Sequence, residues 1–312
     1  MRRVLIAFSA AAVVAVAAGA AFWFLTAPDR LDETALSGLQ PGDVARGERI
    51  FWAGGCASCH GRPRAEGEAR MELAGGEALK TAFGTFVAPN ISPDPENGIG
   101  AWSEADFANA MLRGVSPEGE HYYPAFPYPS YARMEPQDVA DLFAFIKTLP
   151  PVAERPPGHD LSFPFTMRRG IGLWKLLYLH PEPVIALDEG ASDLALRGRY
   201  LVEGPGHCGE CHTPRSAAGG PDYSRWLAGA VAAEGEGTVP NITPSEDGIG
   251  SWSESDIAYY LESGFTPDFD SVGGAMADVQ RNMARLPAED REAIAAYLKA
   301  VPPIEGRPQR QQ

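Results

Sequence analysis

Two short stretches of the sequence contain all four cysteines of the chain. Each has the order Cys-x-x-Cys-His, in "GGCASCHG" and again in "GHCGECHT". Two cysteines at this spacing occur in a thiol–disulfide redox pair, in half of a zinc site and in a covalent attachment point for haem. The residues concerned are Cys56, Cys59 and His60 in the first stretch and Cys208, Cys211 and His212 in the second.

The sequence around the first motif recurs around the second. Three blocks of one half reappear in the same order in the other half. This duplication predicts two related domains, over 40–152 and 191–305, joined by a proline-rich linker over 153–190. The matched blocks are "VARGERIFWAGGCASCHG" with "ALRGRYLVEGPGHCGECHT", "APNISPDPENGIGAWSEADF" with "VPNITPSEDGIGSWSESDI", and "DVADLFAFIKTLPPV" with "DREAIAAYLKAVPPI".

The elements that must position these motifs are helical, and little of the chain is typical of strands. Apolar residues at spacings of three and four, followed by paired prolines, predict a closing helix in each half. Ser103 and Ser253 precede acidic residues and are expected to cap helices. The apolar, basic part of the linker is expected to pack in the seam between the domains, and contact with the membrane or a partner protein is the alternative. The main expected helices are 44–53, 136–149, 193–203 and 287–300.

The N-terminus begins with two arginines, and an uncharged stretch then runs from Val4 to Ala27. This length suffices to cross a bilayer, which takes about 20 apolar residues. The arginines favour a cytoplasmic N-terminus. We expect residues 1–28 to be a single-pass anchor in a bacterial inner membrane, with the body on the periplasmic side. A signal segment cleaved near "AAGAA" is the alternative.

The charge of the chain excludes one class of partner. Its 312 residues include 41 acidic and 26 basic side chains, which gives a net charge of −15. Nucleic acid is not an expected partner, because phosphate binding requires a basic surface. An acidic surface instead suits docking of a protein with complementary positive charge.

The duplication helps to decide among the three chemistries of the motifs. A thioredoxin-like pair would lie in a β–α–β pattern, which the sequence lacks. Zinc would need four ligands, shared awkwardly between two repeats. A haem attachment explains every feature, because two thiols bind the vinyl groups and the adjacent histidine lies beneath the iron. We expect two covalently bound haem c groups, with His60 and His212 as iron ligands.

With these motifs the chain resembles the class I cytochrome c family. It is most similar to dihaem cytochromes that accompany periplasmic dehydrogenases, such as the cytochrome subunit of alcohol dehydrogenase. The resemblance covers nearly everything after the anchor and also rests on "PNI[ST]P…GIG.WS", "YPAFPY" and "GGAMADV". It implies an all-α fold in which two tandem cytochrome c domains follow a transmembrane anchor.

The resemblance also implies a methionine opposite each haem histidine. In the second half this ligand is expected to be Met276, and Met283 is interpreted as a core residue. In the first half the matching residue is Phe126, which cannot bind iron. Met134 is the expected ligand there, and His121 or a vacant position are the alternatives.

Four more residues acquire expected roles from the resemblance. Pro89 and Pro240 stand where the family uses a proline carbonyl to accept a hydrogen bond from the haem histidine. Simple turn prolines are the other interpretation. Trp102 and Trp252 are expected to donate an indole N–H to a haem propionate, to pack in the core, or both.

Electron transfer is the function that these expectations favour. The donor is expected to be a periplasmic protein such as a dehydrogenase, and the electrons then pass to a downstream acceptor. The alternative is a dihaem enzyme, such as a peroxidase-like protein with one open haem, for which Phe126 leaves room. No distal pair of histidine and glutamate stands out in support of that alternative, and the question of enzyme activity stays open.

Overall fold

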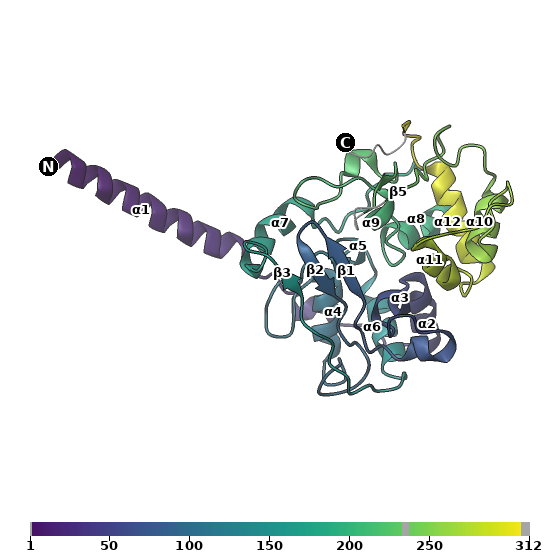
Figure 1. Cartoon of the computed structure of the whole chain (residues 1–312), viewed down its shortest axis with the longest axis horizontal. Helices are drawn as coiled ribbons and strands as arrows, with labels where there is room; N and C mark the ends of the chain where they lie inside the picture. Colours follow the sequence, from purple (N-terminus) through teal and green to yellow (C-terminus); the bar gives the residue numbers. More distant parts are fainter. Residues whose placement is uncertain (1, 233–236, 307–312) are drawn as a thin grey trace.

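The computed structural model describes residues 2–232 and 237–306 (Figure 1). Helix α1 (Arg2–Leu25) projects away from a body formed by the rest of the chain. Among the described residues it is the one helix that is long and apolar enough to cross a membrane, over Arg3–Leu25. The expected apolar span is therefore present as a continuous helix with exposed side chains.

The two halves of the body contain the same helices in the same order. In each half, a leading helix runs into the cysteine motif, and a closing helix ends before paired prolines. The first half has α2 (Val44–Ala53), α3 (Cys56–His60), α4 (Glu104–Arg113), α5 (Tyr128–Tyr131) and α6 (Pro136–Ile146). The second half has α8 (Asp193–Glu203), α9 (Gly209–His212), α10 (Glu254–Ser263), α11 (Met276–Met283) and α12 (Ala288–Ala300).

The leading helix packs closely against the closing helix in each half, and a glycine allows the contact. A Cβ atom on Gly47 of α2 would collide with the carbonyl of Asp141 on α6. A Cβ atom on Gly198 of α8 would likewise collide with the carbonyl of Ala293 on α12. The same backbone-to-backbone contact therefore organises both halves.

The buried side chains of the described part of the chain form one hydrophobic cluster in each half. The first includes Phe51, Leu142 and Met134, and the second includes Leu201 and Met283. Each cluster lies between the leading helix, the closing helix and the helix that a serine caps. Ser103 and Ser253 indeed form capping boxes with Asp106 and Asp256 at the starts of α4 and α10.

Short antiparallel strands qualify the all-α prediction. The order β1–β2–β3 forms a small sheet with Ala78 opposite Val87, and β4 pairs with β5 in the second half. These strands have two to four residues, which is too short for an alternating pattern to reveal them in the sequence. Their bounds are β1 (Ala78–Thr81), β2 (Gly84–Val87), β3 (Asp160–Leu161), β4 (Ala230–Val231) and β5 (Thr238–Val239). Short 3₁₀ helices cover Glu33–Leu36, Gly67–Met71, Arg168–Gly170 and Tyr223–Arg225.

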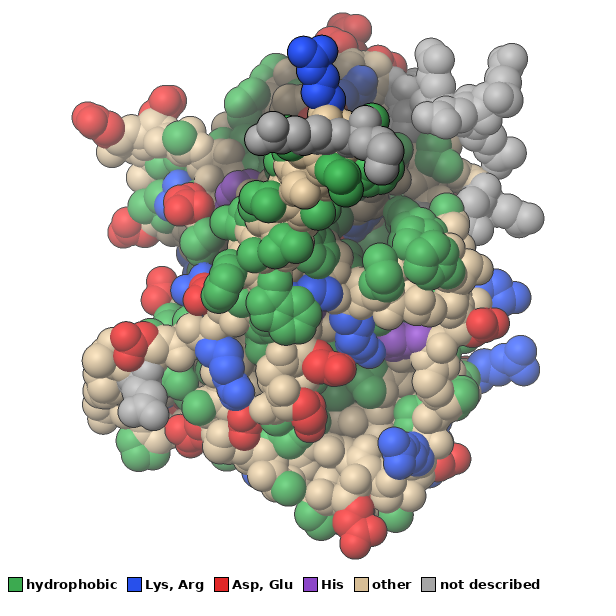
Figure 2. All heavy atoms as spheres, turned by 90° about the vertical axis from the view of Figure 1, so that its left-hand side faces the viewer, with side chains coloured by type: hydrophobic (Ala, Val, Ile, Leu, Met, Phe, Trp, Pro, Cys, Tyr) green, Lys and Arg blue, Asp and Glu red, His purple; other side chains and the backbone are tan. Residues whose placement is uncertain are grey.

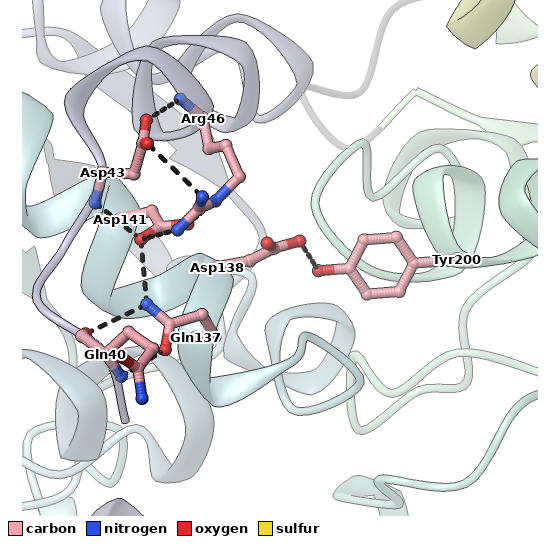
Figure 3. A network of polar contacts seen from close by, with 7 residues as sticks. All are labelled: Gln40, Asp43, Arg46, Gln137, Asp138, Asp141 and Tyr200. Atoms are coloured by element: carbon pink, nitrogen blue, oxygen red, sulfur yellow. Dashed lines mark hydrogen bonds and ion pairs between the residues drawn. The ribbon is translucent and has the colours of Figure 1, made fainter. Parts of the chain in front are cut away.

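Polar contacts hold the start of α2 against α6 (Figure 3). The guanidinium of Arg46 donates to the buried carboxylate of Asp141, which also accepts the backbone N–H of Asp43 at 2.8 Å. Gln137 joins the same carboxylate to the backbone of Gln40. The prediction of helices over 44–53 and 193–203 is confirmed. Of the closing helices, α6 ends three residues earlier than expected, at Ile146, and α12 begins one residue later, at Ala288.

The linker contains helix α7 (Ile171–Tyr178), which lies near the junction of α1 with the body (Figure 1). One face of α7 packs in the seam between the halves, as its sequence suggested. The indole of Trp174 contacts the ring of Tyr128 in the first half and donates to the carbonyl of Ala218 in the second. The opposite face of α7 is exposed, as the alternative expectation for this segment, contact with a membrane or a partner protein, requires.

Candidate functional site

The first cysteine motif forms the short helix α3. Gly55 precedes it with a left-handed backbone, at a φ of 57°, and the two cysteines follow one helical turn apart. Residues three apart lie on the same face of a helix, so the thiols of Cys56 and Cys59 can both reach one ring. Nδ1 of His60 donates a hydrogen bond of 2.8 Å to the carbonyl of Pro89.

The second motif repeats this geometry in α9. Nδ1 of His212 donates a hydrogen bond of 2.8 Å to the carbonyl of Pro240. In both halves the bond orients the imidazole and places its proton on Nδ1, so that Nε2 keeps a free lone pair for a metal ion. The residues present therefore fit a pair of covalently attached, histidine-ligated haems.

Burial shifts the pKa of both motif histidines and of the first cysteine of each motif. It lowers the pKa of His60 and His212 and outweighs the hydrogen bonds to the proline carbonyls, which raise it. Both imidazoles are thus neutral at neutral pH, which is the form that binds iron. Burial also raises the pKa of the Cys56 and Cys208 thiols to about 12.

Two asparagines position the proline carbonyls, and the sequence analysis did not assign them this role. The side-chain amide of Asn90 donates to the carbonyl of Val152 at 2.6 Å, and Asn241 donates to the carbonyl of Ile304 at 2.7 Å. Each asparagine thereby joins the proline loop to the segment that follows the closing helix. The signal was available, since "PNIS" in one half matches "PNIT" in the other.

The expected methionine ligands lie in different surroundings. Met134 is buried at 5% exposure and lines a small cavity together with Cys56 and Tyr131. Met276 begins α11 and is half-buried against the second cluster. Met283, at the other end of α11, is buried in that cluster, which agrees with its interpretation as a core residue.

The side chain of His121, the alternative ligand of the first half, is hydrogen-bonded to a part of the chain away from the cysteine motif. Its Nε2 donates a hydrogen bond of 2.9 Å to the carbonyl of Thr26, just beyond the end of α1. Phe126 instead packs partly buried against the first cluster, with its ring 5.6 Å from that of Tyr131. Of these residues, Met134 is the one that the fold brings to the cavity beside Cys56.

The expected tryptophans also occupy matching places in the two halves. Trp102 lies half-buried against the first cluster and Trp252 against the second, each just before a capped helix. The ring of Trp252 contacts that of Tyr260 at 5.5 Å. Core packing is thus present for both residues.

The two halves meet through paired contacts that the sequence analysis did not anticipate. Arg49 of α2 donates to the buried carboxylate of Asp290 on α12. The matched residues of the opposite halves also touch, because the Tyr200 hydroxyl donates to Asp138 at 2.5 Å (Figure 3). Arg197 adds a second hydrogen bond to Asp290, at 3.1 Å.

A second pair of matched contacts joins the cysteine motifs to the opposite halves. Asn282 of α11 donates to the Ser58 hydroxyl, between the first two cysteines, at 2.7 Å. Their counterparts, Ser130 and Glu210, are joined at 2.8 Å. The interface therefore has approximate twofold symmetry, and each cysteine motif lies at the contact with the other half.

Comparison with known proteins agrees with this geometry. The family model described as "Cytochrome c" matches residues 44–150. A protein of Cereibacter sphaeroides described as "Diheme cytochrome c-type" is 59% identical over 98% of this chain and 100% of its own length. The "Fructose dehydrogenase cytochrome subunit" of Gluconobacter japonicus is 37% identical over 83% of this chain, and the quinone alcohol dehydrogenase cytochrome c subunit of Gluconobacter oxydans is 37% identical over 84%.

These findings show that the chain belongs to the cytochrome c family. With one Cys-x-x-Cys-His motif in each half, it is a dihaem member that carries two covalently bound c-type haems, homologous to cytochrome subunits of dehydrogenases. The chain spans about half the length of the fructose and alcohol dehydrogenase subunits, 52% and 55% respectively.

Proposed function

We propose that this protein is a membrane-anchored electron carrier that receives electrons from a periplasmic dehydrogenase and passes them to an oxidised acceptor. Bound haem iron cycles between two oxidation states and so supplies one-electron transfer. The protein passes each electron that it takes from the reduced donor on to the acceptor. The donor is then oxidised, the acceptor is reduced, and the protein returns to its starting state.

The observation that carries this proposal is the contact of each cysteine motif with the opposite half. Ser58 lies within the first motif and Glu210 within the second, and both are hydrogen-bonded across the interface. Gly54, just before the first motif, accepts a hydrogen bond from His207, just before Cys208, at 3.1 Å. Such an arrangement suits a relay between two bound cofactors.

We propose that His60 and Met134 would bind the iron of the first haem, and that His212 and Met276 would bind that of the second. Hydrogen bonds to Pro89 and Pro240 orient the histidines and raise their basicity as ligands. A thioether ligand in a dry pocket favours the reduced state and raises the potential. In the two tandem cytochrome c domains proposed here, over 40–152 and 191–305, each half thus supplies one complete ligand set.

The location we propose is the periplasmic side of a bacterial inner membrane. Helix α1 is long enough to span a bilayer, and the two arginines at its start favour a cytoplasmic N-terminus. Dehydrogenase relatives such as the cytochrome subunits described above support periplasmic partner proteins.

Spectroscopy and potentiometry of the detergent-extracted protein test the function. We expect a pyridine haemochrome assay to count two haems per chain, and a redox titration to show two one-electron steps. Both oxidised haems should show the near-infrared band of methionine-to-iron ligation. Anaerobically reduced protein should be reoxidised by an oxidised high-potential cytochrome, and a periplasmic dehydrogenase should co-purify with it.

A peroxidase-like enzyme is the competing function, and the relatives described above lend it no support. It would require an open iron, so a high-spin signal from one haem and rapid turnover of hydrogen peroxide would overturn the carrier proposal. A low-spin spectrum that peroxide and carbon monoxide leave unchanged is the result we expect.

A further inference from the structure

Helix α7 is packed directly against the end of α1. Gly172 of α7 is buried there, and a Cβ atom on it would lie 2.6 Å from the Cα of Thr26. Arg169 donates to the Thr26 hydroxyl at 3.0 Å and to the backbone carbonyl of Trp23. Its guanidinium also lies 4.2 Å from the centre of the Trp23 ring.

The first half of the body holds the same point from another side. His121 donates to the carbonyl of Thr26, and its own carbonyl accepts a hydrogen bond from Arg168 at 3.0 Å. Thr26 is fully buried by these contacts. The body is therefore fixed to the end of α1 by side-chain and backbone contacts, so α1 determines which face of the body is turned toward a membrane.

An apolar surface surrounds this fixed point. Figure 2 views the molecule from the side that carries α1, so the hydrophobic side chains seen there include those of α1 itself, which projects toward the viewer, and Lys and Arg side chains lie beside them. Leu177 is 65% exposed and Leu176 is 58% exposed, both on α7. The exposed apolar side chains of the segment, here called the α7 patch, are Phe163, Phe165, Met167, Leu173, Leu176 and Leu177.

The charge of the segment differs from that of the rest of the chain. Residues 162–181 contain three basic side chains and no acidic one, in a chain of net charge −15. Lys175 is buried and donates to the carbonyls of Arg113 and Gly114, so Arg168 and Arg169 are the two basic side chains beside the exposed residues. Basic side chains beside exposed leucines and phenylalanines are typical of segments that lie in the headgroup region of a bilayer. An exposed apolar patch of this kind marks an interaction surface.

We propose that the α7 patch inserts into the lipid headgroup region beside α1, so that the body rests on the membrane surface in one fixed orientation. This inference rests on the proposed membrane anchoring by α1. The occupant is a lipid surface because the patch is continuous with the end of the membrane helix, through the contacts of Gly172 and Arg169 with Thr26. Insertion would remove the apolar surface of the exposed leucines from water, which is favourable.

Site-directed spin labelling of the full-length protein in lipid nanodiscs tests this inference. The four native cysteines are consumed by haem attachment, so an introduced cysteine is the one reactive thiol. We would label Leu177→Cys and Leu176→Cys and compare accessibility to oxygen, which enriches in lipid, with accessibility to a water-soluble nickel chelate. The matched control is Tyr259→Cys, on helix α10 and 57% exposed.

We expect the oxygen-to-nickel ratio at Leu177→Cys to be several-fold higher than at Tyr259→Cys. Equal ratios at the two positions would overturn the inference. A position that neither reagent reaches would also overturn it, because the patch would then be covered by protein, such as a second copy of the chain.

Two further readouts separate this inference from the proposed function. A label at Val13→Cys in α1 reports whether α1 itself is in lipid, and the absorption spectrum reports both haems. If the label at position 13 is in lipid and the label at position 177 is in water, the insertion of the α7 patch is refuted and the anchoring by α1 is not. A water-exposed Val13 defeats the anchor and the patch together, while the haem count still tests the redox chemistry.

Discussion

The two halves of the molecule share a scaffold but differ in where the candidate methionine ligand arises. The backbone bridge between Val115 and His121 in the first half corresponds to the bridge between Phe265 and Ser271 in the second. Counted from these bridges, Phe126 corresponds to Met276. The first half carries its methionine eight residues later, at Met134, between α5 and α6.

The surroundings of the motif histidine are the same in the two halves, whereas those of the candidate methionine differ. The histidine, its proline carbonyl and the asparagine that positions the loop are the same in both halves, with both histidine bonds at 2.8 Å. The opposite side of the pocket is built from a loop whose helix has four residues in α5 and eight in α11. The candidate methionine lies at the start of this helix in the second half and three residues beyond its end in the first.

The halves differ again at the bridge residues themselves. His121 is buried against the end of α1, whereas its counterpart, Ser271, is exposed. The first half thus carries the junction with α1, whereas the matching bridge of the second half does not contact α1.

Substitution of the packing glycines should have a large effect and should affect both halves alike. Gly47→Ala and Gly198→Ala each place a methyl group onto a carbonyl of the closing helix. We expect each to lower the free energy of unfolding by about 3 kcal/mol, measured by denaturant titration, and to reduce the yield of holoprotein. Gly190→Ala is the control, since open space surrounds that position. If only one of the two substitutions lowers the free energy of unfolding, the halves do not share this contact.

Substitution of the candidate methionines should separate the halves. Met134→Ala removes a buried side chain and should cost about 2–5 kcal/mol of unfolding free energy, whereas Met276→Ala, at a half-buried position, should cost less. Each should also abolish the near-infrared band of one haem and lower its potential. Met283→Ala is the control, because it should destabilise the second half and leave both bands intact. If both bands survive the substitution of Met134 or of Met276, that methionine is not an iron ligand.

The paired contacts between the halves should contribute unequally to the free energy of unfolding. Arg49→Met withdraws a charged hydrogen bond from the buried Asp290 and should cost about 1.5–3 kcal/mol. Tyr200→Phe removes the matched contact with Asp138 and should cost about 1 kcal/mol. Arg281→Met, which breaks an exposed ion pair with Asp278, is the control and should change little. Equal losses from all three variants would show that the interface contributes no more than the surface does.

The carboxylate at this interface should also set an acid limit on stability. Burial would raise the pKa of Asp290, but hydrogen bonds from Arg49 and Arg197 outweigh it and lower the pKa below its ordinary value. In acid the unfolded chain therefore binds a proton before the folded one does. The stabilisation is complete above about pH 4, the ordinary value for aspartate, and is lost as the pH falls through the lower folded value.

Unfolding titrations at a series of pH values would measure this effect. Arg49→Met should flatten the loss of stability below about pH 4, because it removes one of the two groups that lower the pKa. An acid limb with the same slope in this variant and in the unchanged protein would show that Asp290 does not control it.

The sequence by itself determined the local features of this protein. Cysteine spacing, apolar periodicity and serine caps act within a few residues, so the motifs around His60 and His212 and the helices 44–53 and 193–203 could be predicted without a structure. The duplication then predicted two equivalent halves. The expectation of little strand is also confirmed, since the strands of the described residues have two to four residues each. Their positions were not predicted, because such short pairs show no alternating pattern and one of them, β2 with β3, joins residues more than 70 apart.

Only the tertiary structure decided which distant residues meet. Nothing in the sequence joins Arg49 to Asp290 or Asn282 to Ser58, because these pairs are more than 200 residues apart and depend on how the halves dock. The same is true of His121, a candidate metal ligand by residue type that the fold assigns to the end of α1. A side chain's chemistry is local, whereas its partner is set by the packing of whole helices, and only the folded chain fixes that packing.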